Sequence, residues 1–240
     1  MTDVNIPDEV HMPNRRVAAM GRTSDDLRAA REHGYETARP DVAAHVPRSA
    51  TNILELGCST GALGAAIKQR QPTSVVGIEY DPTYAGEAAG RLDRVIVGDA
   101  EKALAEPFPE APFDCLIAAD LLEHLVDPWT ALSRAADLLA PGATAVISLP
   151  NVLWYEGLLR ILRRRRWPRD PEGVFDQTHL RWFALDDGMD MLRGAGLEPD
   201  VVEPRYWVDG KPLARRRRLE RTPLMPFLAP QYVLTARKPG

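Results

Sequence analysis

Five short apolar runs, separated by segments with helical spacing, constrain the fold more than any other feature of this sequence. The runs lie at residues 52–56, 74–79, 94–97, 113–119 and 144–149. They are rich in branched side chains, which is typical of buried strands. The intervening segments with helical spacing include residues 61–70, 82–92 and 127–140, the last of which we expect to stop at Pro141-Gly142. The alternation predicts βαβ units and a mainly parallel, doubly wound α/β sheet.

The alternation breaks after residue 150. Residues 151–180 are predicted to form an insertion, with a helix over 153–165 followed by a basic run and a loop rich in Pro, Gly and Asp. A helix over 184–195 and strands over 201–207 and 231–237 follow. The 240 residues are therefore predicted to form one domain. Its parts are an N-terminal arm and helices (1–50, with a helix over 25–38), a core (51–150), the insertion (151–180) and a C-terminal helix and strands (181–240).

The two cysteines, Cys58 and Cys115, are too few for a disulfide framework, and neither belongs to a CxxC pair of the kind that binds zinc. The polar N-terminus lacks an apolar signal core, and no run of about 18 apolar residues occurs. We therefore expect a cytoplasmic protein without integral membrane contact.

The segment ILELGCSTGALGAAIK, residues 53–68, carries the most specific motif. A strand ends at Glu55 and Leu56, and a glycine-containing turn leads into a helix. Glycines there let the backbone approach a ligand closely, and the helix N-terminus supplies N–H groups. Glu79 ends the next strand, where an acid can accept hydrogen bonds from both ribose hydroxyls, and Asp99 ends the third strand, where it can accept from an adenine amino group. The spacing fits neither GxGxxG nor GxxxxGK[ST], which disfavours NAD and P-loop sites.

The set ELGCSTG, VVGIEYD, VIVGDAE and FDCLIAADLLEHLVDP resembles the class I S-adenosylmethionine-dependent methyltransferases. LEHLVDP resembles the small-molecule branch that contains the ubiquinone and menaquinone biosynthesis enzymes and natural-product enzymes. The resemblance covers about residues 35–207. It implies a seven-stranded Rossmann-like sheet whose last strand is antiparallel, with a helical lid insertion after strand 5. It also implies S-adenosyl-L-methionine as the cofactor and S-adenosyl-L-homocysteine as the product.

In this family the glycine turn holds the methionine moiety, and the acids that match Glu79 and Asp99 bind ribose and adenine. Arg39 is expected to pair with the methionine carboxylate, and the alternative is a solvated helix residue. Ser59 replaces the middle glycine of the family turn, so a positive φ there would strain the backbone. The predicted cofactor site comprises Tyr35, Arg39, Glu55, Gly57, Cys58, Ser59, Gly61, Glu79, Tyr80, Asp99, Ala100 and Asp120.

Two histidines are candidates for a general base. His124 follows the fourth strand near the expected sulfonium; its alternative role is to pack the start of the helix. His179 lies in FDQTHLRWF, which resembles a D-x-T-H-L-R-F-F segment that follows a variable lid in this branch. In that segment Asp176 and Thr178 are expected to cap the following helix, and Arg181 to face the acceptor cleft or brace the lid.

Two aromatic residues and one set of acids complete the predicted acceptor region. Trp154 and Tyr155 are expected to line an apolar acceptor pocket or to fix the insertion to the core. Methyl transfer demands no metal and none is predicted; a divalent ion held by Asp120, Glu123 and His124 is the alternative.

The net charge of −4 hides an uneven distribution. Residues 1–150 hold 13 basic and 22 acidic side chains, whereas residues 151–240 hold 17 basic and 12 acidic ones, with runs at Arg163–Arg166 and Arg215–Arg218. Arginine pairs bidentately with carboxylates and phosphates, so the runs favour an anionic acceptor. Their alternatives are a solvated helix face and the binding of RNA or an anionic membrane surface.

We therefore predict a monomeric or homodimeric enzyme that transfers a methyl group from S-adenosylmethionine to an oxygen or nitrogen of a small molecule, such as a natural product or sugar. The alternatives are RNA or protein methylation through the arginine runs, and a non-catalytic binding module of the same fold. Nucleic acid is disfavoured as a partner because residues 1–150 are acidic and no RNA-binding module is recognisable.

Overall fold

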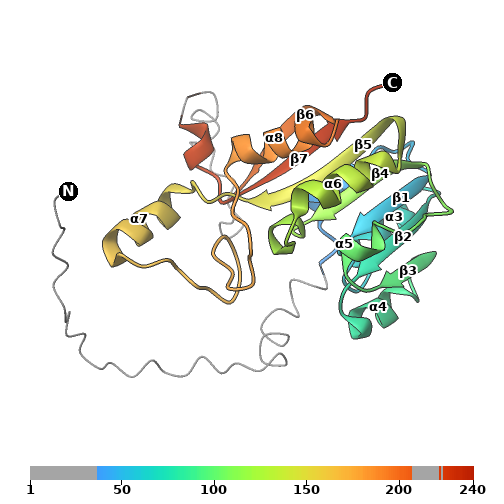
Figure 1. Ribbon diagram of the computed structural model, residues 1–240, viewed down its shortest axis with the longest axis horizontal. Coiled ribbons are helices and arrows are strands. Elements are labelled where there is room, and N and C mark those ends of the chain that lie inside the picture. Colours follow the sequence, from blue (N-terminus) through green and yellow to red (C-terminus); the bar gives the residue numbers. More distant parts are fainter. Residues whose placement is uncertain (1–36, 207–221, 223) are drawn as a thin grey trace, which may run out of the picture.

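The computed structural model describes residues 37–206, 222 and 224–240. Seven strands form one sheet in the order β3-β2-β1-β4-β5-β7-β6 (Figure 1). All pairs from β3 to β5 are parallel, and β7 runs antiparallel to both β5 and β6. The strands are β1 (Asn52–Leu56), β2 (Ser74–Glu79), β3 (Arg94–Val97), β4 (Phe113–Ala119), β5 (Leu139–Pro150), β6 (Glu198–Arg205) and β7 (Gln231–Arg237). The predicted mainly parallel sheet with an antiparallel last strand is confirmed.

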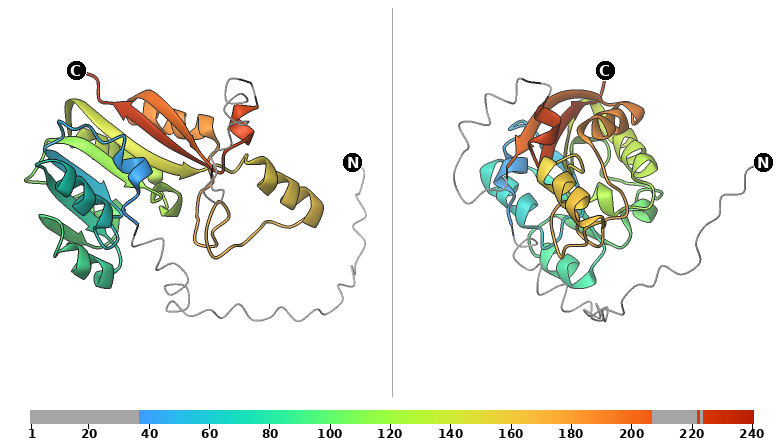
Figure 2. Two further views of the ribbon diagram at one scale, coloured as in Figure 1. Left: turned by 180° about the vertical axis from the view of Figure 1, so that it is seen from behind. Right: turned by 90° about the vertical axis from the view of Figure 1, so that its left-hand side faces the viewer.

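Helices cover both faces of this sheet (Figures 1 and 2). They are α2 (Pro40–Ala43), α3 (Ala62–Arg70), α4 (Pro82–Ala88), α5 (Ala100–Ala103), α6 (Pro128–Asp137), α7 (Tyr155–Arg164) and α8 (Leu185–Gly194), with 3-10 turns η1 (Leu122–His124) and η3 (Met225–Phe227). The predicted helix over 25–38, and with it Tyr35, lies outside the described residues, as do Trp207 and Arg215–Arg218. No helix of the described part of the chain combines the length and the apolar character needed to cross a membrane.

Two apolar clusters form the core, one on each face of the sheet. Successive side chains of a strand point to opposite faces, so Ile53 joins one cluster while Leu54 joins the other. The Ile53 cluster contains buried residues of α2, α3 and the end of α4, and the Leu54 cluster contains those of α5, α6 and α8. This arrangement buries both faces of the central strands and holds their carboxyl ends at one fixed edge.

The structure corrects several predicted boundaries: the helix predicted over 82–92 ends at Ala88, the strand predicted over 144–149 begins at Leu139, and one further helix end and both ends of β6 also differ. The helix predicted over 127–140 ends at Asp137, and Pro141-Gly142 lies inside β5 instead of terminating the helix. The pairing explains this: Phe113 opposes Leu139 whereas Cys115 opposes Thr144, so the extra β5 residues form a bulge, in which Gly142 has φ 79°. The last two corrections concern β6, which begins at Glu198 and ends at Arg205. Within the described residues β6 pairs with β7 alone, and an edge strand needs no continuous apolar run.

The predicted insertion begins after β5 and contains α7, which projects from the end of the sheet (Figures 1 and 2). Its two ends lie together, because Asn151 bridges Phe183 and the Val152 N–H donates to the Phe183 carbonyl at 2.9 Å. Within it, the Arg160 guanidinium donates to Asp170 Oδ1 at 2.6 Å and so ties α7 to the loop that follows. The chain thus leaves the sheet and returns to it at the same place.

Candidate active site

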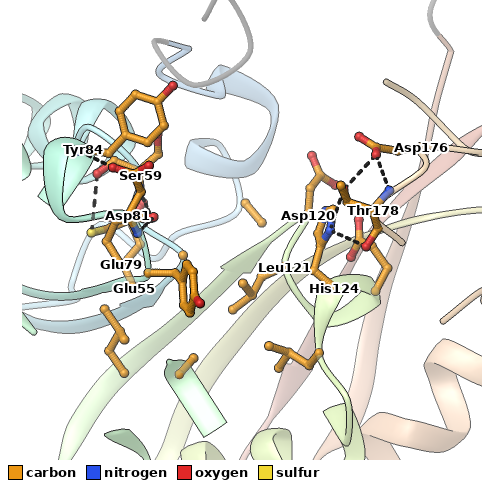
Figure 3. Close-up of a pocket in the computed structure, with 18 of the residues that line it drawn as sticks. Glu55, Ser59, Glu79, Asp81, Tyr84, Asp120, Leu121, His124, Asp176 and Thr178 are labelled. Atoms are coloured by element: carbon orange, nitrogen blue, oxygen red, sulfur yellow. Dashed lines mark hydrogen bonds between the residues drawn. The ribbon is translucent and has the colours of Figure 1, made fainter. Parts of the chain in front are cut away.

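A pocket of about 1270 Å³ opens where the parallel strands end. Open α/β sheets bind ligands at this edge. Figure 3 shows its two sides: Glu55, Ser59, Glu79, Asp81 and Tyr84 lie on one, and Asp120, His124, Asp176 and Thr178 lie on the other.

The turn after β1 has the close-approach geometry that its glycines predict. Gly57 and Gly61 have φ of 68° and 77°, and a Cβ on Gly61 would lie 3.1 Å from the Ala88 Cα. Ser59 has φ 50°, so it occupies the left-handed region that strains a residue with a side chain. The Gly57 and Cys58 N–H groups both donate to the Ile78 carbonyl, at 2.8 and 3.0 Å, which ties the turn to β2.

Glu79 sits at the centre of the cofactor side. Its Oε2 accepts from the Ser59 N–H at 2.7 Å and its Oε1 accepts from the Asp81 N–H at 2.8 Å. Burial raises the pKa of Glu79, and these backbone hydrogen bonds oppose the rise. Both oxygens are therefore held in place, and each keeps a second lone pair that can accept from a ligand hydroxyl.

The predicted adenine end is present in the same wall. Asp99 and Ala100 line the pocket, and the Asp99 carboxylate accepts from the Glu101 N–H at 2.8 Å at the start of α5. Tyr80 also lines the pocket, although its side chain is 77% exposed. The predicted site did not include Asp81 and Tyr84, which lie in the same wall. Asp81 is the last residue of the motif VVGIEYD, and Tyr84 lies three residues beyond it.

Glu55 is buried beneath the turn. Its side chain is 3% exposed, and its Oε2 has no hydrogen-bond partner among the described residues. Burial raises the pKa of Glu55 to about 8, although a backbone hydrogen bond from Gly64 lowers it in part. This raised pKa favours the protonated form of Glu55 at neutral pH.

Arg39 bridges the pocket edge to β4 through two carboxylates. Its guanidinium donates to Asp120 Oδ2, and to Asp41 at 3.0 and 3.1 Å. Asp120 also accepts from Ser148 Oγ at 2.7 Å and from Gln231 Nε2 at 2.5 Å. Burial lowers the pKa of Arg39, but the two carboxylates outweigh it and raise that pKa overall. Arg39 is thus a pocket residue, and in this state its partners belong to the chain itself.

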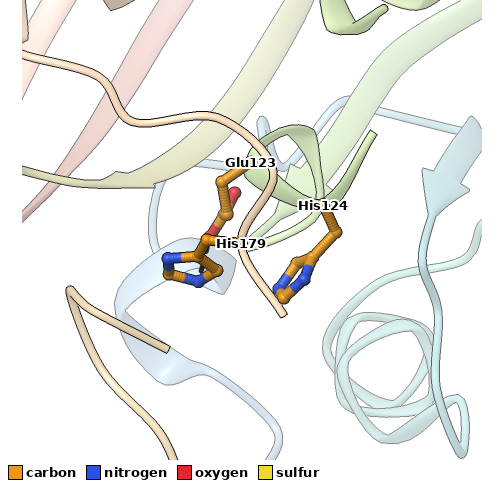
Figure 4. Close-up of side chains that lie close together, drawn as sticks. All are labelled: Glu123, His124 and His179. Atoms are coloured by element: carbon orange, nitrogen blue, oxygen red, sulfur yellow. Dashed lines mark ion pairs between the residues drawn. The ribbon is translucent and has the colours of Figure 1, made fainter. Parts of the chain in front are cut away.

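The two candidate bases lie against each other (Figure 4), with ring centroids 4.8 Å apart and the planes at 74°. His179 is 8% exposed, its Nδ1 is 3.2 Å from the Val174 carbonyl, and its Nε2 is 3.8 Å from Glu123 Oε1. Burial and the neighbouring His124 lower the pKa of His179 to about 4. Burial, followed by the Asp120 charge, raises the pKa of Glu123 well above its ordinary value. The raised pKa of Glu123 and the lowered pKa of His179 both favour the neutral form of the side chain, so a neutral Glu123 lies beside a neutral His179.

His124 is less buried than His179 and contacts Thr178, near the end of the predicted insertion. We call residues 151–175 the α7 insertion and residues 176–181 the segment after it. The His124 Nδ1 is 3.3 Å from the Thr178 carbonyl and 3.2 Å from Thr178 Oγ1. Thr178 Oγ1 donates to Asp176 Oδ1 at 2.8 Å, and so does the Thr178 N–H. Asp176 and Thr178 thus order a turn beside His124; they do not cap the next helix, because α8 begins at Leu185 with Ala184 as its N-cap.

One ring or carboxylate atom from each of Glu123, His124 and His179 lies within 4.8 Å of the others. These are metal-binding types of side chain. This group differs from the predicted alternative set, Asp120, Glu123 and His124, in having His179 in place of Asp120.

Three predicted acceptor residues do not line this pocket. Tyr155 lies at the start of α7 and its hydroxyl donates to Glu156 Oε1 at 2.7 Å; Trp154 precedes it. Arg181 donates to the Val126 carbonyl. Conversely, Gln231 and Glu123 line the pocket, although Gln231 was not predicted and Glu123 entered only as an alternative metal ligand. The acid next to His124 in the LEHL segment is a signal for Glu123, whereas Gln231 reaches Asp120 across 111 residues and has no local signal.

Residues 27–202 match a family described as a methyltransferase domain, and the chain belongs to this family. It is 27% identical over 188 residues to 27-O-demethylrifamycin SV methyltransferase from Amycolatopsis mediterranei (strain S699), covering 75% of this chain and 66% of that protein. It is 28% identical over 170 residues to a ubiquinone biosynthesis O-methyltransferase from Ruegeria pomeroyi, covering 66% of this chain and 64% of that protein. The chain thus spans just under two thirds of the length of these relatives.

A solved structure shares the fold. It is a Thermotoga maritima protein described as a SAM-dependent methyltransferase and possible histamine N-methyltransferase, with a TM-score of 0.59, 18% identity, and coverage of 89% of this chain and 93% of that one. The predicted family and its fold are therefore confirmed. The two curated relatives are named for small molecules, which does not favour the alternative of RNA or protein methylation.

Proposed function

We propose that the protein is an S-adenosylmethionine-dependent methyltransferase that methylates a hydroxyl of a small molecule. The observation that carries this proposal is one pocket with two ends. The Glu79 carboxylate is fixed beside a glycine turn at one end, and His124 stands beside the end of β4 at the other. The relatives named O-methyltransferases support oxygen as the acceptor atom. Transfer to nitrogen remains the predicted alternative.

The residues present suit this cofactor. Glu79 would accept from the ribose hydroxyls, Asp99 would accept from the adenine amino group, and Arg39 would turn from Asp120 to the methionine carboxylate. Glu55 and Glu123 each have a buried carboxyl oxygen without a hydrogen-bond partner among the described residues, and both line the pocket. Bound S-adenosylmethionine supplies the methyl group as an electrophile. The chain aligns the acceptor, excludes water and removes the hydroxyl proton.

His124 suits the role of general base better than His179. A base must accept a proton near neutral pH, and the pKa of His179 is lowered to about 4. His179 is also buried between Val174 and Glu123. His124 lines the same pocket without this enclosure. We therefore assign proton removal to His124, with His179 as a packing partner.

The charge and the binding mode of the acceptor stay predictions. Four carboxylate side chains lie at the acceptor end of the described lining, namely Asp120, Glu123, Glu172 and Asp176. They favour hydroxyl groups next to the base. The exposed arginines at the end of α7, such as Arg163 and Arg164, would attract an anionic group of the acceptor from a distance, since no residue of α7 is among the described lining of the pocket. In this proposal the insertion acts as a lid, and the protein works as a cytoplasmic monomer or homodimer with a single methyltransferase domain.

Calorimetric titration with S-adenosylmethionine tests the cofactor half. We expect binding by the wild type, and at least about tenfold weaker binding by Glu79→Ala, because the variant loses about 1.5–3 kcal/mol of charge-assisted hydrogen bonding. Glu87→Ala on the exposed face of α4 is the matched control and should bind like the wild type. No binding by the wild type at millimolar cofactor would refute the proposal, and equal affinity of Glu79→Ala would remove Glu79 from the site.

A further inference from the structure

The hydrogen bonds around His124 determine which ring nitrogen carries the proton. A backbone carbonyl can only accept, so the contact between Nδ1 and the Thr178 carbonyl at 3.3 Å requires a hydrogen on Nδ1. The Thr178 hydroxyl leads to the same result, because it donates its own hydrogen to Asp176 Oδ1 and can therefore only accept from His124. Both acceptors favour the Nδ1–H tautomer, in which Nε2 has the lone pair.

Asp176 orients this arrangement through two bonds. Its Oδ1 accepts from both the N–H and the hydroxyl of Thr178, each at 2.8 Å, so the turn and the hydroxyl are fixed together (Figure 3). Asp176 is 9% exposed and lines the same pocket as His124. Without the carboxylate, the Thr178 hydroxyl would be able to rotate and donate to Nδ1, which would favour the opposite tautomer.

The same segment is attached to η1 by its backbone. The Glu123 carbonyl accepts from the Leu180 N–H at 2.8 Å and from the Arg181 N–H at 3.0 Å. His124 and Thr178 are 54 residues apart in the sequence, and the α7 insertion lies between them. Docking of the segment after the insertion onto η1 therefore brings the acceptors to Nδ1.

We infer that Thr178, oriented by Asp176, is the positioning residue that sets the His124 tautomer, so that the base is complete only when the segment after the α7 insertion is docked on η1. The inference rests on the proposed role of His124 as the base. Its consequence is that the variable insertion and the proton-accepting atom are mechanically linked. A change that undocks residues 176–181 removes the base without touching His124.

Histidine side-chain NMR on the ¹⁵N-labelled full chain tests this without an acceptor. Long-range ¹H–¹⁵N correlations distinguish the Nδ1–H and Nε2–H tautomers of neutral imidazole. His124→Gln and His179→Gln assign the two signals among the five histidines. At a pH above the imidazole titration we expect wild-type His124 mainly as Nδ1–H. An Nε2–H signal for His124 in the wild type overturns the inference, whatever the variants show.

The variants test the residues separately. Thr178→Val keeps the shape and removes the hydroxyl, and should shift the Nδ1–H to Nε2–H ratio at least threefold toward Nε2–H. Thr178→Ser should restore the wild-type ratio. Asp176→Ala should shift the ratio in the same direction as Thr178→Val. A folded Thr178→Val with the wild-type ratio would contradict the role of the hydroxyl. Binding of S-adenosylmethionine, measured on the same samples, reports separately on the proposed function.

Discussion

Buried carboxyl groups dominate the chemistry of the pocket at the scale of single residues. Glu55, Glu79 and Glu123 all have raised pKa values, and burial is the first cause in each case. A raised pKa means that the folded chain holds a proton that the unfolded chain has released. Each group therefore makes the stability of the ligand-free protein depend on pH.

Glu55 gives the clearest prediction of this kind. With a pKa of about 8 in the folded state and 4.5 as its ordinary value, its contribution to stability falls as pH rises from about 4.5 to about 8 and is constant outside that window. Glu55→Gln removes this dependence. We expect the variant to gain stability relative to the wild type by at most about 1.4 kcal/mol per pH unit across the window.

Chemical denaturation at pH 5, 6.5 and 8 measures this difference. Asp114→Asn provides a comparison, because Asp114 is a partly buried carboxylate of β4 that accepts from the Thr51 and Asn52 N–H groups. A difference between Glu55→Gln and the wild type that stays constant over the three pH values would show that Glu55 is ionised throughout.

Local motifs, together with the family resemblance they carry, led to the residues predicted for the cofactor side but not to the contacts between distant segments. Glu79, Asp99 and the glycine turn are local to the ends of β1, β2 and β3, and a sequence motif records such local geometry. The pairing of Arg39 with Asp120 and the contact of His124 with Thr178 join segments 81 and 54 residues apart. Only tertiary packing decides such contacts, so the sequence left open which of the two histidines is the more buried; both line the pocket.

At the scale of elements, the β1–α3 unit is held so tightly that one glycine in α3 has no room for a side chain. A Cβ on Gly64 would lie 2.6 Å from Leu92 Cδ2 and 2.7 Å from Glu55 Oε2. Gly86 in α4 is the opposite case, since a Cβ there meets nothing within 4 Å. Substitution of Gly64 by alanine therefore tests packing together with helix propensity, whereas substitution of Gly86 tests helix propensity alone.

We expect Gly64→Ala to lower the free energy of unfolding by about 1–3 kcal/mol, because the strain of overpacking exceeds the gain in helix propensity. Gly86→Ala should raise it by about 0.5–1 kcal/mol, because alanine is the better helix former and fits without strain. Thermal or denaturant unfolding measures both. Stabilisation by Gly64→Ala would mean that Leu92 and Glu55 can move aside.

Element boundaries were predictable where the local pattern decides them. Strands β1 to β4 and β7 have the predicted ends, since apolar runs bounded by turns determine them. The bulge that carries β5 through Pro141-Gly142, and the edge strand β6, depend on their partners and have no local pattern. The short helix α5 was missed because four residues, 100–103, are too few for a period to be recognised.

At the scale of the whole molecule, the pocket has a strongly negative wall. The described lining residues include nine carboxylates but only one arginine, Arg39, and no lysine; the carboxylates are Glu55, Glu79, Asp81, Asp99, Glu101, Asp120, Glu123, Glu172 and Asp176. Protonation of Glu55 and Glu123 reduces this charge without cancelling it. A cleft of one sign attracts ligands of the other sign.

This wall should distinguish the proposed cofactor from its product by charge. S-Adenosylmethionine has a sulfonium cation that S-adenosylhomocysteine lacks. We therefore expect the affinity for S-adenosylmethionine to fall about threefold or more between 50 and 500 mM NaCl. The affinity for S-adenosylhomocysteine should fall less. Calorimetry with both ligands measures the two slopes. Equal slopes would show that the wall exerts no net field at the sulfur.

The pairing of the two ends of the insertion also affects how the sequence of such a chain can change during evolution. Asn151 and Phe183 lie side by side, so everything between them leaves and returns at one place on the sheet. The length and the side chains of such a segment can change while the strands of the sheet keep their register, because the two ends of the segment stay paired. The condition is that the exchanged piece still ends in the Asp176–Thr178 turn, because that turn supports the base. Under the proposed function, we expect that exchanging residues 153–175 alters the acceptor side, to which Glu172 and Gly173 belong, and leaves the turn after β1 and Glu79 unchanged.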